Sequence, residues 1–203
     1  MTRKSKSTRT VYVVGAGFSA GLGYPLVGDL LIRLWDRLSS DLQVRLEKVV
    51  KFHHPTFDVR RRTSFPTIEL LLSEMMANED LFDASRAAPG NFSLHDLEVV
   101  RRDLLLSIYK WFHEIHKGVF ENLPRWLKGF RDHLVQPQDT IISFNWDLVL
   151  DQLMFESGIS RASYGFGKTE NLVRLLKPHG YLNWYDSATA TKIKREVARQ
   201  NWT

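Results

Sequence analysis

Three short apolar runs divide the chain and predict the strands of a sheet. They cover residues 11–14, 140–144 and 172–176. Runs of this length that are rich in β-branched residues are typical of buried strands and are short for buried helices. In the first run, Tyr12, Val13 and Val14 suit a fully buried strand. The sequence therefore predicts a sheet whose strands come from distant parts of the chain.

Apolar residues at helical spacing fill most of the chain between these runs. The spacing predicts helices over about 28–38, 41–50, 67–76, 94–115, 124–134 and 148–155. Thr67 is a candidate N-cap for the third of them. We expect residues of about 60–135 to form a helical layer, inserted between the first two strands or packed over the sheet. The pattern predicts an α/β fold with a Rossmann-like parallel sheet, helices on both faces and this helical layer.

A glycine-rich turn follows the first strand directly. Val14 runs into Gly15-Ala16-Gly17-Phe18-Ser19, and a helix can begin there. A glycine after a strand allows a tight turn, and a second one lets a ligand approach the backbone, so that N–H groups face a pyrophosphate. The alternative is a plain strand-to-helix turn. A second cluster of helix breakers, Leu22-Gly-Tyr-Pro25, is expected to form a loop over whatever the turn holds.

Polar residues also follow the other two predicted strands. Asn145 and Asp147 come after residue 144, and His179 comes shortly after residue 176. The carboxyl ends of parallel strands are where open α/β sheets bind ligands. Each residue has a structural alternative: Asn145 or Asp147 could cap the helix expected from Leu148, and His179 could be a turn residue.

A dehydrogenase-type dinucleotide site is not favoured. In that fingerprint, an acidic residue about 20 positions after the glycines ends a second strand and holds the ribose hydroxyls. Asp36 has this spacing but lies in a helical pattern, where a solvated side chain is expected.

Composition and charge narrow the function classes further. The chain of 203 residues has no cysteine, which excludes a disulfide framework and cysteine-ligated zinc. The net charge of +5 lies at the two ends, since Arg3, Lys4, Lys6 and Arg9 precede the first strand and the last stretch is also basic. Solvated tails are favoured over a nucleic-acid groove, and a basic arm on nucleic acid or an acidic partner is the alternative.

Metal and membrane sites are not expected. His113 and His116 are three apart on a predicted helix, but no third ligand accompanies them, so exposed helix histidines are favoured over a shared metal. No apolar stretch approaches the roughly 18 residues of a membrane helix. We expect a cytoplasmic protein without a membrane segment.

Together the motifs resemble the SIR2-like family, in particular its cysteine-free branch from bacterial antiphage defence. The resemblance rests on the glycine turn with Gly23-Tyr-Pro25, on Phe144-Asn-Trp-Asp147 and on the segment from Lys177 to Trp184, with Ile68-Glu69 also similar. It implies an NAD-binding domain over residues 11–184. The charge pattern predicts a basic flexible tail over 1–10 before this domain and a charged helical segment over 185–203 after it.

The resemblance also implies roles for individual residues. Ala16, Gly17, Phe18 and Ser19, next to Gly15, would hold the pyrophosphate and the adjacent ribose of NAD. Asn145 and His179 would be catalytic, with His179 as the base, and Asp147 would support the nicotinamide-ribose pocket. The mobile cofactor loop would contain Gly23 and Pro25.

The implied activity is an NAD glycohydrolase that releases nicotinamide and ADP-ribose without a metal, as a defence effector. Its partners would be NAD and a regulatory protein or further copies of the chain. A silent NAD or ADP-ribose-binding module is the first alternative and an NAD-dependent deacetylase the second. Deacetylases of the family carry a four-cysteine zinc module and an Asp-Phe-Arg-like run where this chain has Leu26-Val27-Gly28. The family also continues beyond the His-Gly motif, so the chain is expected to be a fragment or to have an incomplete pocket.

Overall fold

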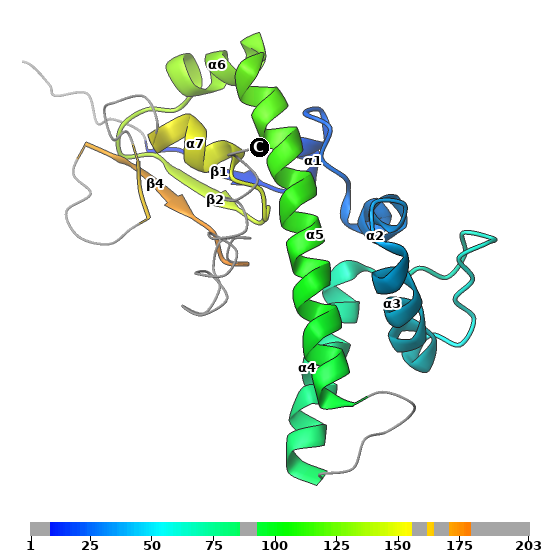
Figure 1. The fold of residues 1–203 in the computed structure, drawn as a ribbon. Coiled ribbons are helices and arrows are strands. Elements are labelled where there is room, and N and C mark those ends of the chain that lie inside the picture. The colour runs from blue at the N-terminus through cyan, green and yellow to red at the C-terminus, as the bar shows by residue number, and fades with distance from the viewer. Residues whose placement is uncertain (1–8, 86–92, 156–161, 165–170, 180–203) are drawn as a thin grey trace, which may run out of the picture. The chain divides into compact units, whose positions relative to one another are not determined.

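The computed structural model describes residues 9–85, 93–155, 162–164 and 171–179 (Figure 1). The basic tail up to residue 8 and the segment predicted over 185–203 lie outside these residues. The chain divides into two compact units, one of Met1–Tyr24 with His113–Thr203 and one of Pro25–Phe112. We refer to them as the sheet unit and the helical unit.

The described part of the sheet unit is an α/β structure. Its four strands are β1 (Val11–Val14), β2 (Thr140–Ser143), β3 (Ala162–Ser163) and β4 (Val173–Leu176). They lie in the order β1-β2-β4-β3, and every neighbouring pair is parallel. Figure 1 labels β1, β2 and β4. The three strands predicted from apolar runs are confirmed to within a residue at each end. The run Ala-Ser of β3 is too short and too polar to have been predicted.

One expectation for β1 is wrong, because the strand is not fully buried. Val11 and Val13 are 59% and 65% exposed, while Tyr12 and Val14 are half-buried. Successive side chains of a strand point to opposite faces of the sheet. β1 is an edge of the described sheet, and its odd-numbered residues lie on a face that the described residues leave open to solvent.

The described helices of the sheet unit, apart from the end of α5 (Leu94–Glu121), are short. They are α1 (Ala16–Ala20), α6 (Arg125–Gly129), the π-helix η1 (Phe130–Leu134) and α7 (Val149–Phe155). The helix predicted over 124–134 is therefore split into an α-helical and a π-helical turn. Phe130 is buried and packs against the rings of Tyr12 and Phe18, with centroids 5.5 and 5.4 Å away.

The helical unit contains α2 (Val27–Trp35), α3 (Ser40–His53), α4 (Ile68–Ser85) and the part of α5 (Leu94–Glu121) up to Phe112. The spacing of apolar residues explains these helices, since it places fully buried side chains on one face of each, among them Leu34, Leu46, Ile68, Leu71, Met75, Leu97, Leu104 and Ile108. As predicted, Thr67 caps α4, accepting a hydrogen bond from the N–H of Leu70 at 3.3 Å. α4 and α5 extend further than the pattern indicated, to Ser85 and Glu121.

In the described part of the chain, no helix has both the length and the apolar character that crossing a membrane requires.

Ile141 offers a test of the sheet core, because it lies in β2 with 0% exposure. We expect Ile141→Ala to lower the free energy of unfolding by about 2–5 kcal/mol, from lost apolar burial and the cavity left behind. Urea denaturation of the whole chain measures this. Val13→Thr is the matched control, since Val13 is 65% exposed, and it should change stability by less than about 0.5 kcal/mol. Equal losses in the two variants would contradict the assignment of the buried face.

Candidate functional site

The glycine turn joins β1 to α1 and is open. Gly15 precedes α1 in an extended conformation (φ −124°), and its carbonyl accepts a hydrogen bond from the N–H of Phe18 at 2.9 Å. A Cβ added at Gly15 or Gly17 would meet no atom within 4 Å, and neither residue has a positive φ. The described fold itself therefore does not require glycine at these two positions. Because α1 has only five residues, its macrodipole is a small part of any attraction for an anion.

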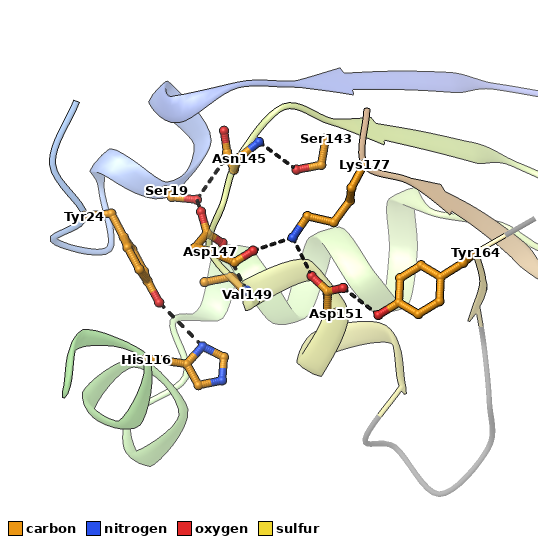
Figure 2. A network of polar contacts seen from close by, with 10 residues as sticks. All are labelled: Ser19, Tyr24, His116, Ser143, Asn145, Asp147, Val149, Asp151, Tyr164 and Lys177. Atoms are coloured by element: carbon orange, nitrogen blue, oxygen red, sulfur yellow. Dashed lines mark hydrogen bonds and ion pairs between the residues drawn. The ribbon is translucent and has the colours of Figure 1, made fainter. Parts of the chain in front are cut away.

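Behind this turn, Ser19 links the carboxyl ends of β1 and β2. Its hydroxyl donates to Asp147 Oδ2 at 2.7 Å and accepts from Asn145 Nδ2 at 3.0 Å (Figure 2). All three side chains are buried, with exposed fractions of 2% for Ser19, 7% for Asn145 and 6% for Asp147. The structure thus brings together three residues that the sequence placed at two separate strand ends. We call them the Ser-Asn-Asp cluster.

Asp147 also caps α7, which was the structural alternative for this residue. Its second oxygen, Oδ1, accepts a hydrogen bond from the N–H of Val149 at 3.0 Å, at the start of α7. One carboxylate therefore caps the helix and holds Ser19 at the same time. Asn145 does not cap the helix; its own N–H donates to Ser143 Oγ at 3.3 Å.

The protons of the cluster leave one buried acceptor without a partner. A carboxylate only accepts hydrogen bonds, so the single proton of Ser19 goes to Asp147 and Asn145 must turn its NH₂ group toward the hydroxyl oxygen. This orientation leaves Asn145 Oδ1, which is buried and has no hydrogen-bond partner within the described residues. An unsatisfied buried acceptor costs about 1–3 kcal/mol, and a ligand that donates a hydrogen bond would satisfy it.

A second group of polar residues lies beside the cluster and includes a histidine that the sequence placed on an exposed face. His116 is half-buried. Its Nδ1 lies 3.5 Å from the hydroxyl of Tyr24 (Figure 2). Its Nε2 pairs with Gln152 Oε1. The expectation for His116 was therefore wrong, because packing within the sheet unit covers that face of α5. His113 is exposed, as expected. The described residues contain no group of three or more side chains that could hold a metal ion.

Tyr24 belongs to the predicted loop after the glycine turn and is 4% exposed. Burial raises the pKa of Tyr24 well above its ordinary value, and the charge of Asp147 raises it further. The hydroxyl therefore remains protonated next to the cluster.

A third group, on the other side of Asp147, was not found from the sequence. Lys177 follows β4 and donates to the backbone carbonyl of Asp147 and, at 2.8 Å, to Asp151 Oδ2. Asp151 Oδ1 accepts from the hydroxyl of Tyr164 at 2.7 Å. Two signals in the sequence point to it: Lys177 begins the motif segment that ends at Trp184, and Asp151 stands among the apolar residues of α7.

The remaining predicted site residues are not members of the Ser-Asn-Asp cluster. Ala16 begins α1. His179 is exposed, and its ring packs edge to face on Phe144 at 5.1 Å; no hydrogen bond joins it to the Ser-Asn-Asp cluster in the described residues. Phe18 packs on Trp126 at 5.3 Å and on Phe130. Pro25 is buried but belongs to the helical unit.

Comparison with known proteins adds no family to this description. No protein-family model and no curated protein matches the chain.

The central hydrogen bonds can be tested at Ser19. We expect Ser19→Ala to lower the free energy of unfolding by about 1–3 kcal/mol, because it leaves Asp147 Oδ2 and the Asn145 amide buried without their partner. Thermal or urea denaturation measures the loss. Ser73→Ala, an exposed serine in α4, is the control and should change stability by less than about 0.5 kcal/mol. A loss no larger than that of the control would show that the cluster contributes no stability.

Tyr24 gives a pH-dependent test. The Tyr24 hydroxyl keeps its proton to higher pH in the folded protein than in the unfolded chain. The contribution of Tyr24 to stability is therefore complete below pH 10.0 and is lost as the pH rises above this value. Above it, the free energy of unfolding of the wild type should fall by about 1.4 kcal/mol per pH unit more steeply than that of Tyr24→Phe. Denaturation curves between pH 7 and pH 11 measure the difference. Parallel curves over the whole range would contradict a buried, protonated Tyr24.

Proposed function

We propose that this chain binds NAD and hydrolyses its nicotinamide–ribose bond, releasing nicotinamide and ADP-ribose. The observation that carries the proposal is the unpartnered acceptor of Asn145, buried at the carboxyl ends of two parallel strands. A ribose hydroxyl could donate a hydrogen bond to Asn145 Oδ1. The neutral amide would accept this bond without adding a charge that would compete with a developing cation.

The glycine turn supplies the place for the pyrophosphate. Gly15 and Gly17 have open space where a side chain would stand, so a ligand can approach the backbone N–H groups. Ser19 connects this turn to the Ser-Asn-Asp cluster through its two hydrogen bonds. The phosphates and the nicotinamide ribose of one NAD molecule would therefore lie on neighbouring strand ends.

The charge of the buried groups fits a cationic reacting centre. Asp147 and Asp151 are buried carboxylates, and Lys177 is the buried ammonium that pairs with Asp151. One negative charge is left at Asp147. A fixed negative charge favours the pyridinium of NAD and the oxocarbenium-like state in which the glycosidic bond breaks.

Hydrolysis of the nicotinamide–ribose bond needs a general base but no general acid. Nicotinamide leaves the cationic ring as a neutral molecule, so its departure takes up no proton. A water attacks the anomeric carbon and loses a proton to the base. His179 is the candidate for this role, because an imidazole accepts protons near neutral pH.

The wider setting belongs to the same proposal. The sheet would be the core of a Rossmann-like domain with helices on both faces, of the SIR2-like type found in antiphage defence. The protein would act in the cytoplasm, where a regulatory protein or further copies of the chain control NAD depletion.

A silent NAD or ADP-ribose-binding module is the second candidate. It is favoured by the position of His179, whose ring packs on Phe144 without a hydrogen bond to Asn145 or Asp147 in the described residues. Such a module would use the same acceptor of Asn145 to hold a ribose but would not turn NAD over.

Incubation of the purified protein with NAD, with nicotinamide release followed by chromatography, tests the two candidates. We expect His179→Ala to lower kcat by about 10²- to 10⁴-fold, as for loss of a general base. Asn145→Ala should lower kcat/KM by about tenfold or more through the lost hydrogen bond. His113→Ala, another exposed histidine, is the control and should stay within about twofold.

Equal nicotinamide release from the wild type and His179→Ala would remove His179 from the mechanism. Calorimetric binding of ADP-ribose that is weakened by Asn145→Ala, without turnover of NAD, would establish the silent module instead. Turnover only in the presence of an acetylated peptide would indicate a deacetylase.

A further inference from the structure

Lys177 occupies a position in the sheet unit where an apolar side chain is expected. Along β4, Val173 and Leu175 are buried while Arg174 and Leu176 are exposed, and Lys177 continues the buried set with a side-chain exposure of 1%. Moving an ammonium group out of water is strongly unfavourable even in a protein that relaxes around it. The partners of Lys177 must therefore offset this cost.

The partners of Lys177 among the described residues belong to segments that follow the strands. Lys177 Nζ donates to the carbonyl of Asp147, in the turn between β2 and α7, and to Asp151 Oδ2 at 2.8 Å, within α7. Asp151 in turn accepts from Tyr164, which follows β3, at 2.7 Å. Figure 2 shows Lys177 Nζ between the two aspartates, with Tyr164 on the far side of Asp151.

These bonds join the turn after β4 to the turn after β2 at a defined point. A second contact lies two residues further on, where the ring of His179 meets that of Phe144 with centroids 5.1 Å apart. Pro178 stands between the two contacts, and its ring fixes φ, so the path from Lys177 to His179 has few free dihedrals. The position of the His179 imidazole therefore depends on where the ammonium group of Lys177 is held.

We propose that Lys177 is a positioning residue, whose hydrogen bonds to Asp147 and Asp151 fix the turn carrying His179 against the end of β2 that carries Asn145. The catalytic consequence rests on the proposed function, since it matters only if His179 acts on a substrate held by Asn145. The placement of His179 does not depend on that function and can be measured without substrate.

The absence of cysteine from the chain permits a side-chain exchange at this one position. Lys177→Cys is prepared and alkylated in denaturant, then refolded. Reaction with 2-bromoethylamine gives a lysine analogue that restores the ammonium group. Reaction with 1-bromopropane gives a side chain of the same length that ends in a methyl group. The two proteins differ only in the hydrogen-bonding cation.

The first measurement is the NMR spectrum of the histidine rings, with the signal of His179 identified by its loss in His179→Gln. We expect the aminoethyl protein to reproduce the wild-type shift, because the ring stays against Phe144. The propyl protein should lose the ring-current displacement from Phe144. An unchanged His179 signal in the propyl protein, or a change that the aminoethyl group does not reverse, overturns the proposal.

The second measurement is NAD hydrolysis, normalised to the folded fraction. We expect kcat of the propyl protein to fall about 10- to 100-fold, as for a misplaced catalytic group, with KM within about threefold because substrate contacts are kept. The aminoethyl protein should regain the wild-type kcat. A loss of stability alone, with kcat per folded molecule unchanged, assigns Lys177 a purely structural role and contradicts the proposal.

Two further comparisons separate a failure of this proposal from a failure of the variant to fold and from a failure of the proposed function. If the propyl protein does not fold, its combination with Asp151→Asn removes the unpaired carboxylate along with the cation, and the same loss of the His179 shift is expected from it. If the wild type does not hydrolyse NAD, the proposed function fails while the NMR comparison still decides the positioning role.

Discussion

The hydroxyl of Ser19 is the contact on which the candidate site depends. It comes from the first helix after β1, yet both of its hydrogen bonds go to residues that follow β2, more than 120 positions later in the chain. Because its only proton goes to Asp147, the hydroxyl oxygen can only accept from Asn145, and this decides which way the amide of Asn145 points. The buried, unpartnered acceptor of Asn145 at this edge of the sheet is thus a consequence of how two strand ends are joined.

The parallel sheet makes this joining possible. β1 and β2 pair along their whole length, from Val11 opposite Thr140 to Val14 opposite Ser143, so the residues after both strands emerge at the same edge. β4 pairs with β2 in the same direction and delivers Lys177 to the same place. Each polar residue there is held by a neighbour from another strand, and few of them could be removed without leaving a buried group unpaired.

Asp147 has neutral hydrogen-bond donors on one side and the Lys177–Asp151 ion pair on the other. On one side its carboxylate meets hydroxyl and N–H donors from Ser19 and Val149. On the other, Lys177 is balanced by Asp151, so the lysine does not cancel the charge of Asp147. The same residues therefore stabilise the fold and set the electrostatics that would select a cationic substrate. Asp147 thus caps α7 and holds Ser19 with the two oxygens of one carboxylate.

The sequence by itself determined three of the four described strands, most of the helices and the residues of the Ser-Asn-Asp cluster, because these depend on local periodicity and on the rule that parallel strands end at one edge. Only the tertiary structure decided the rest. The exposure of Val11 and Val13 depends on what covers a sheet face, and the contacts of His116 and Lys177 depend on partners from other elements. Such contacts leave no periodic signal, since the hydrogen bonds of a side chain are set by the segments that pack against it and not by its neighbours in the chain.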